Sequence, residues 1–128
     1  MSSKAKLLAV DDSQTVRISL EKAFSKHYIV LLAADAEQCL HLAEREDGIE
    51  LLLVDYNLPD LNGLEMIEKI RKMPKHKNTP IFIISAEGQT HLKKIAKSLD
   101  VVGWVSKPIN GQALLDKIKI WKEKKGIA

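Results

Sequence analysis

The chain has 128 residues, of which 45% are hydrophobic and 29% charged, as is usual for one soluble globular domain. A formal net charge of +3 with 5% aromatic residues is too little for a nucleic-acid-binding surface, and no apolar run approaches the roughly 20 residues of a membrane-spanning helix. The single cysteine, Cys39, excludes an internal disulfide, so composition predicts a cytoplasmic single-domain protein and leaves its activity open.

Apolar runs and helical patterns alternate from the start of the chain. Lys6–Val10 is a predicted strand, and Ser13 is a good N-cap for the helix that follows it. Tyr28–Ala34, which is dense in β-branched and apolar residues, predicts a second strand.

The middle of the chain contains the segment with the strongest pattern of burial. Asp35 and Gln38 form a capping-box pattern that opens a second helix, which we expect to end at Gly48. The run Leu51–Val54 is apolar at every position, which suits a strand buried on both faces of a parallel sheet. Asp55 follows directly, so we expect its carboxylate at the carboxyl edge of the sheet, where open α/β sheets bind ligands.

The second half of the chain continues the alternation. The pair Asn62-Gly63 marks a turn before a third helix, and the polar segment 74–79 is expected to be an exposed linker. Residues 80–85 predict a fourth strand. The fourth helix has a predicted apolar stripe of Leu92, Ile95, Ala96 and Leu99.

One more strand and helix complete the pattern. Val101–Val105 predicts a short strand interrupted by Gly103, and Asn110 caps the final helix. Five strands then alternate with five helices, which argues for an α/β fold with a parallel sheet, helices on both faces and right-handed crossovers. We expect one domain over residues 1–128, with its core at about 6–121.

Polar side chains follow four of the predicted strands at the edge where those strands end. They are Asp11 and Asp12, then Asp55, Ser85 and Lys107. Three carboxylates in one cleft repel each other unless a cation lies between them, and oxygen ligands suit Mg²⁺ or Mn²⁺. A carboxylate nucleophile, a divalent metal, an ammonium and a hydroxyl donor are together the parts of a phosphoryl-transfer site.

Four motifs at these positions resemble the receiver domain of two-component response regulators, the CheY-like family. They are Val-Asp-Asp-Ser at 10–13, Asp-Tyr-Asn-Leu-Pro-Asp-Leu-Asn-Gly at 55–63, Ile-Ile-Ser-Ala at 83–86 and Gly-Trp-Val-Ser-Lys-Pro at 103–108. The resemblance covers about Lys6 to Trp121. It implies a flavodoxin-like (βα)5 three-layer sandwich with strand order 2-1-3-4-5, and a cis peptide bond between Lys107 and Pro108.

The resemblance also implies a role for each site residue. Asp55 matches the phosphoacceptor, Lys107 the lysine that binds the phosphoryl group, and Ser85 the hydroxyl that switches toward it. The implied Mg²⁺ ligands are Asp11, Asp12, Asp55 and the backbone carbonyl of Asn57.

Three positions bear on phosphate lifetime and on the conformational switch. Asn57 and Glu87 match the positions that tune hydrolysis of the acyl phosphate, and their combination resembles that of fast-cycling chemotaxis regulators. Trp104 stands where Tyr or Phe is usual in the family. Because indole is larger than phenol, we expect the inward position of Trp104 to be crowded.

The implied function is signalling, and we do not class the protein as an enzyme. A sensor histidine kinase or a histidine phosphotransfer protein would phosphorylate Asp55, and the acyl phosphate would draw Ser85 and Trp104 inward. The face formed by the helix at 92–99, the strand at 101–105 and the final helix would then change for a downstream protein partner. No nucleic acid or membrane is implied, we expect a monomer or weak dimer, and the pathway is open, with chemotaxis as one option.

Three alternative kinds of protein share part of this pattern. A Mg²⁺-dependent phosphatase of the haloacid-dehalogenase type needs a second Asp as general acid two positions after its nucleophile, where this chain has Asn57. A flavin-binding electron carrier shares the fold, but Asp11 and Asp12 would repel a phosphate in its first loop. A receiver excised from a larger regulator with a separate output domain also stays open, although Met1 and the lack of a linker-like tail favour a single-domain regulator.

Two remaining groups are interpreted as surface features. No histidines have metal-ligand spacing, so surface or loop positions are expected for all four: His27, His41, His76 and His91. The lysines at 93, 94 and 97 fall on the implied output face and could steer an acidic partner.

Overall fold

A parallel β-sheet forms the middle layer of the protein in a computed structural model that describes residues 4–86 and 92–126. Its strand order is β2-β1-β3-β4-β5, which confirms the topology that the family resemblance implied. The strands are β1 (Ala5–Val10), β2 (Tyr28–Ala33), β3 (Ile49–Asp55), β4 (Ile81–Ser85) and β5 (Gly103–Ser106). The helices are α1 (Gln14–Phe24), α2 (Ala36–Arg45), α3 (Gly63–Arg71), the 3-10 helix η1 (Pro74–His76), α4 (Lys93–Ser98) and α5 (Gly111–Lys125).

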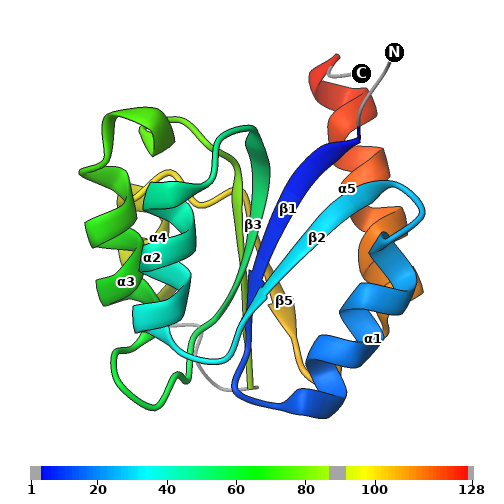
Figure 1. Ribbon diagram of the computed structural model, residues 1–128. Helices are drawn as coiled ribbons and strands as arrows, with labels where there is room; N and C mark the ends of the chain where they lie inside the picture. The colour runs from blue at the N-terminus through cyan, green and yellow to red at the C-terminus, as the bar shows by residue number, and fades with distance from the viewer. Residues whose placement is uncertain (1–3, 87–91, 127–128) are drawn as a thin grey trace.

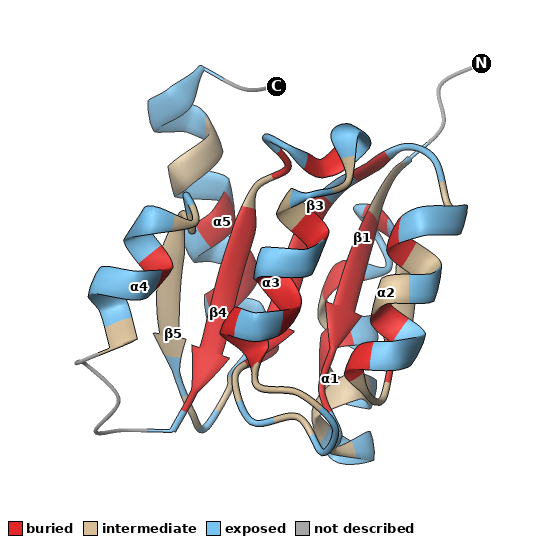
Figure 2. Ribbon diagram, turned by 90° about the vertical axis from the view of Figure 1, so that its left-hand side faces the viewer, coloured by how far each residue is buried: buried red, intermediate tan, exposed pale blue. Residues whose placement is uncertain are grey.

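Helices cover both faces of the sheet, with α1 and α5 on one side and α2, α3 and α4 on the other (Figure 1). Successive residues of a strand point to opposite faces, so each strand contributes to two cores. Leu52 and Val54 pack in the core beneath α2 and α3, whereas Leu51 and Leu53 pack in the core with α1 and α5. Figure 2 shows the central strands buried between helices with exposed outer faces, which explains why Leu51–Val54 has no polar position. No helix within residues 4–86 and 92–126 is both long enough and apolar enough to span a membrane.

Polar side chains cap α1, α2, α3 and α5 at their amino ends. Ser13 and Asn110 act as the N-caps that the sequence predicts, and Asp35 accepts a hydrogen bond from the Gln38 amide at 2.8 Å. The full capping box predicted for α2 is wrong, because the Gln38 side chain accepts from Ala34 N–H, one residue before the cap. A reciprocal box occurs instead at α3.

The start of α3 differs from the predicted turn. Asn62 accepts from the Glu65 amide at 2.9 Å, and Glu65 Oε1 accepts from the Asn62 amide at 3.3 Å, which completes a capping box. Gly63 is therefore the first residue of α3, and the predicted Asn62-Gly63 turn is a helix start. The spacing of Asn62 and Glu65 is itself the sequence signal for this box.

Two further boundaries and one predicted buried position differ from the predictions. The helix α2 ends at Arg45, and Gly48 lies beyond it in a turn with φ of +81°. Strand β5 begins at Gly103, which pairs with Phe82 of β4, so Gly103 belongs to the strand and does not interrupt it. A side chain at this position would lie 2.8 Å from the Phe82 ring. Ile95 is 51% exposed and is not part of the buried stripe of α4.

The segment 74–79 is only partly the exposed linker that its polarity predicted: four of its residues are exposed, whereas His76 and Thr79 are buried. His76 is 2% exposed; its Nδ1 lies 2.9 Å from Thr79 Oγ1 and its Nε2 lies 2.8 Å from the Ala43 carbonyl oxygen. The Arg71 guanidinium donates to the carbonyls of His76 and Thr79 and to those of Leu99 and Asp100. Because these partners satisfy their polar groups, His76 and Thr79 pack inward, and the surface assignment of His76 is wrong.

Candidate functional site

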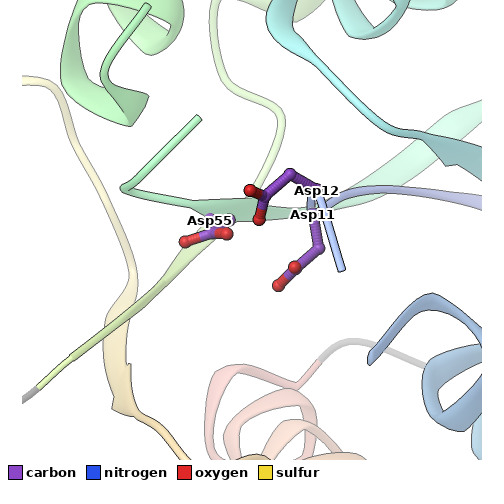
Figure 3. A group of neighbouring side chains, drawn as sticks. All are labelled: Asp11, Asp12 and Asp55. Carbon is purple, nitrogen blue, oxygen red and sulfur yellow. The ribbon is translucent and has the colours of Figure 1, made fainter. Parts of the chain in front are cut away.

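Three carboxylates meet at the carboxyl edge of the sheet. Val10 of β1 pairs with Val54 of β3, so Asp11 and Asp55, the next residues, lie level with each other. One carboxylate oxygen each from Asp11, Asp12 and Asp55 lies within 4.8 Å of the other two (Figure 3). Asp11 and Asp55 have 0% exposure, whereas Asp12 is open to solvent. The structure thus brings together the acidic residues that the sequence predicted to meet.

Each buried carboxylate is oriented by a backbone N–H two residues further on. Asp11 Oδ1 accepts from the Ser13 amide at 2.9 Å, and Asp55 Oδ1 accepts from the Asn57 amide at 3.0 Å. In both residues the backbone amide binds Oδ1, so Oδ2 is the oxygen that can bind another group of the site. Asp11 Oδ2 is buried and has no hydrogen-bond partner among the described residues.

Lys107 supplies the positive charge next to these carboxylates. Its Nζ lies 3.1 Å from Asp55 Oδ2 and 3.6 Å from Asp11 Oδ2. Burial would lower the pKa of the Lys107 ammonium, but the carboxylates of Asp55, Asp11 and Asp12 outweigh burial and raise it. Lys107 is therefore a stable cation that reaches both buried carboxylates.

The acceptor candidate has a strongly shifted acidity. Burial raises the pKa of Asp55 to about 6, and the nearby charge of Asp11 raises it as well. The Asn57 amide and the Lys107 ammonium lower it, but less than the other two causes raise it. Asp55 is thus a buried carboxylate with incomplete charge compensation.

The residues present fit a divalent cation. Three carboxylates face one ammonium, so the cluster retains an excess of negative charge. Within the described part of the chain the buried Asp11 Oδ2 has no hydrogen-bond donor, which is unusual for a buried carboxylate oxygen unless an ion completes the site. Oxygen-only donors of this kind suit Mg²⁺.

Ser85 and Trp104 lie on neighbouring strands close to this cluster. Ser85 is fully buried at the end of β4; its Oγ donates to the Ala86 carbonyl at 3.3 Å, and its own carbonyl accepts from the Lys107 amide at 2.8 Å. Trp104 is half-buried on β5, pairs with Ile83 and packs at the edge of the core beneath α4. Glu87, assigned to phosphate lifetime, lies outside the described residues, as does His91.

Two residues near the site carried no assigned role in the sequence. The guanidinium of Arg17 of α1 donates to the Asp11 carbonyl at 2.7 Å, which fixes the backbone of Asp11. A Cβ at Gly63 would lie 2.9 Å from both the Asp55 carbonyl oxygen and Tyr56 Cα, so only glycine lets α3 begin against the acceptor strand. The Gly63 residue follows the helix cap directly, which is a usable sequence signal, whereas nothing in the sequence pattern marks Arg17.

Comparison with known proteins assigns the chain to a family. The response regulator receiver domain matches residues 7–119, and the chain belongs to this family. It is 31% identical over 116 residues to a chemotaxis protein CheY homolog of Campylobacter jejuni, covering 89% of each chain. It is 30% identical over 117 residues to chemotaxis protein CheY1 of Helicobacter pylori, covering 90% of this chain and 94% of that protein.

Solved structures agree with this assignment. Chemotaxis protein CheY4 of Vibrio cholerae has a TM-score of 0.85 at 30% identity and covers 91% of this chain and 98% of its own. A CheY-like receiver domain protein of Methanospirillum hungatei has the same TM-score at 26% identity. The protein is therefore a phosphoacceptor response regulator with a flavodoxin-like fold, and the phosphatase and flavin-carrier alternatives are not favoured. Receiver domains generally bind Mg²⁺, and the acidic cluster could hold such an ion.

Proposed function

We propose that Asp55 is the residue that accepts the phosphoryl group. The observation that carries this proposal is the geometry of its two oxygens: Asn57 N–H holds Oδ1, while Oδ2 faces Lys107. A carboxylate with one oxygen fixed by a backbone amide and the other next to a cation is preorganised for attack on phosphorus. Asp11 and Asp12 are also carboxylates, but Asp11 lies farther from Lys107 and Asp12 is exposed to solvent.

The other site residues support this transfer. Asp11, Asp12, Asp55 and the Asn57 carbonyl would hold Mg²⁺, with Mn²⁺ as an alternative, and the ion would supply charge compensation when bound. Asp55 Oδ2 forms the new O–P bond as the P–N bond of a phosphohistidine breaks, and the imidazole of the donor keeps that electron pair. Lys107 offsets negative charge on the phosphoryl oxygens during this exchange.

We further propose that phosphorylation is read through Ser85 and Trp104. Among the residues that the structure describes, Ser85 Oγ makes a single 3.3 Å hydrogen bond, to the adjacent carbonyl, so its hydroxyl can be recruited by a phosphoryl oxygen on Asp55. Movement of Ser85 would open space for Trp104 on the next strand. Asn57 and Glu87 would set the lifetime of the acyl phosphate.

Partners and pathway follow from the family. CheY-like receivers interact with histidine kinases and downstream targets, so we propose a sensor kinase or phosphotransfer protein as donor and a protein as target. The names of the relatives support a chemotaxis-like pathway. We propose a signalling role for a single receiver domain, as a monomer or weak dimer, and no enzymatic action on a diffusible substrate.

The α4–β5–α5 face is the proposed docking surface for the target. Lys93, Lys94 and Lys97 of α4 are exposed, and none of the ion pairs between described residues includes them. A groove of about 140 Å³ beside them is lined by Lys93, Ala96, Lys97, Val101, Gly103 and Trp104. This combination of cations and apolar floor suits an acidic segment with an apolar side chain.

This surface assignment is tested with matched charge reversals. We expect a labelled peptide of alternating Glu and Leu to bind the beryllofluoride–Mg²⁺ form, measured by fluorescence anisotropy. Lys97→Glu, in the groove lining, should lose most of the binding, whereas Lys94→Glu, which makes the same charge change outside the lining, should bind far better. Equal losses in both variants would mean that general charge, and not this groove, attracts the peptide.

The acceptor assignment is tested directly by mass spectrometry. Incubation with acetyl phosphate and Mg²⁺ should add the mass of one phosphoryl group to the wild-type chain and none to Asp55→Asn. Removal of the metal with a chelator should suppress labelling of the wild type. An unmodified wild type, or equal labelling of Asp55→Asn, contradicts the proposal.

A further inference from the structure

We propose that Asp60 is a positioning residue, which clamps the phosphoacceptor loop between β3 and α3 to the amino end of α2. The functional consequence rests on the proposed role of Asp55 as acceptor. Asp60 lies five positions after Asp55, in the middle of the loop, and none of the predictions from sequence gave it a role.

Both carboxylate oxygens of Asp60 are used on a different segment of the chain. Oδ1 accepts from the Ala36 amide at 2.9 Å, and Oδ2 accepts from the Glu37 amide at 3.0 Å. A third bond, from the Leu61 amide to Oδ1 at 3.1 Å, fixes the carboxylate within its own loop. Hydrogen bonds from the Ala36 amide and then from the other backbone amides lower the pKa of Asp60. Such bonds, from the positive end of a helix to a carboxylate, are of the stronger charge-assisted kind.

The helix α2 does not need Asp60 to begin. Its own N-cap, Asp35, already accepts from the Gln38 amide at 2.8 Å. The amides of Ala36 and Glu37 are the remaining donors of the first turn, and Asp60 reaches them from 24 and 23 positions away, respectively. Asp60 therefore adds a connection between two segments, which a local cap cannot provide.

Asp60 can affect the position of Asn57 and Asp55 because the loop between β3 and α3 is short and its two ends are bonded to each other. Only two residues, Leu58 and Pro59, separate Asp60 from Asn57, and both limit its freedom: Leu58 packs on the core and Pro59 has a fixed φ. The Gly63 amide donates to the Tyr56 carbonyl at 2.7 Å, which ties the two ends of the loop together. Displacement of Asp60 would therefore displace Asn57.

Asn57 is the residue through which Asp60 acts. Its amide holds Asp55 Oδ1 at 3.0 Å, and this bond leaves Asp55 Oδ2 facing Lys107 at 3.1 Å. Loss of the clamp should let the Asn57 amide open more often, so that Asp55 spends less time in the attacking orientation. Asp60 touches neither the phosphoryl group nor a reacting atom in this scheme.

The test compares Asp60→Ala with Asp35→Ala, because both variants remove a carboxylate that binds the first turn of α2. Hydrogen exchange of the Asn57 amide, followed by NMR without metal or phosphodonor, should accelerate about tenfold in Asp60→Ala and less than about twofold in Asp35→Ala. The initial rate of labelling by acetyl phosphate and Mg²⁺ should fall by about threefold or more only in Asp60→Ala.

Several outcomes decide the proposal. Equal exchange at Asn57 in the two variants would overturn it, because Asp60 would then be only another helix cap. If Asp60→Ala does not fold, Asp60→Asn serves in its place, since a side-chain amide can accept one of the two helix bonds but not both. Exchange of the Asn57 amide at the wild-type rate in Asp60→Asn would also overturn the proposal. The exchange measurement needs no phosphorylation, so an unlabelled wild type would refute the role of Asp55 while the clamp is still tested.

Discussion

Lys107 Nζ lies 3.1 Å from Asp55 Oδ2, although the two residues are 52 positions apart in the chain. The contact exists because β3 and β5 run parallel on either side of β4 and end at the same edge of the sheet. The Lys107 amide is bonded to the Ser85 carbonyl at the end of β4, which holds the lysine backbone at that edge. The same ammonium lies 3.6 Å from Asp11 Oδ2, so it holds together two buried carboxylates that would otherwise repel each other.

Replacement of Lys107 should therefore slow phosphorylation strongly. In Lys107→Met the transferred group loses its fixed cation, and we expect the rate of labelling by acetyl phosphate to fall about a hundredfold, as for loss of one preorganised electrostatic contact. Rates are measured by mass spectrometry at saturating Mg²⁺. Lys94→Met, an exposed lysine of α4, is the control and should label at the wild-type rate. Wild-type kinetics in Lys107→Met would exclude a role for this ammonium in transfer.

The raised pKa of Asp55 has a consequence for stability in the absence of divalent metal. The pKa is about 6 in the folded protein, above the value of about 3.9 expected when unfolded. The folded state thus binds this proton more tightly, so the contribution of Asp55 to the free energy of unfolding is largest below about pH 4 and decreases as pH rises through about 6. Ionised Asp55 is a destabilising group at neutral pH.

Asp55→Asn should remove this cost. We expect the free energy of unfolding to increase by about 2 kcal/mol at pH 8 and by much less at pH 4, measured by urea titration with a chelator present. Asp47→Asn, at a side chain that is 94% exposed, is the control and should not reproduce the pH-dependent gain. A gain of equal size at both pH values would show that the effect does not come from ionisation of Asp55.

The meeting of the site residues was predictable because it depends on rules that act along the whole chain. Alternation of buried strands and helices forces a parallel sheet, and the ends of parallel strands bring Asp11, Asp55, Ser85 and Lys107 to one edge. The receiver motifs then identify the chemistry, and the family match at residues 7–119 agrees with them.

Residues whose role depends on a distant partner were not predictable in this way. His76 is buried because its ring meets the Ala43 carbonyl, 33 positions away, and a polar segment alone gives no sign of such a partner. Asp60 looks like an ordinary loop carboxylate until α2 is placed beside it. Polarity predicts exposure correctly only where the fold does not provide hydrogen-bond partners.

The buried His76 should contribute substantially to stability. In His76→Ala the Ala43 carbonyl and the Thr79 hydroxyl lose their partner and a cavity remains, so we expect a loss of about 2–4 kcal/mol in the free energy of unfolding. His41→Ala, at an exposed position of α2, is the matched control and should change stability by less than about 0.5 kcal/mol. Comparable losses in both variants would show that burial of His76 is not the cause.

The fluorescence of Trp104 should report whether the switch reaches β5. Trp121, the only other tryptophan, packs on Phe82 at a ring distance of 5.6 Å in the opposite core, so Trp121→Phe isolates the Trp104 signal. Because half-buried Trp104 lines the groove next to α4, we expect its emission to shift when beryllofluoride and Mg²⁺ are added to Trp121→Phe. The same addition to Asp55→Asn/Trp121→Phe should leave the emission unchanged. If Trp104 emission stays constant while mass spectrometry still detects phosphorylation, the larger indole has uncoupled β5 from Asp55, and the signal must leave the site without this aromatic side chain.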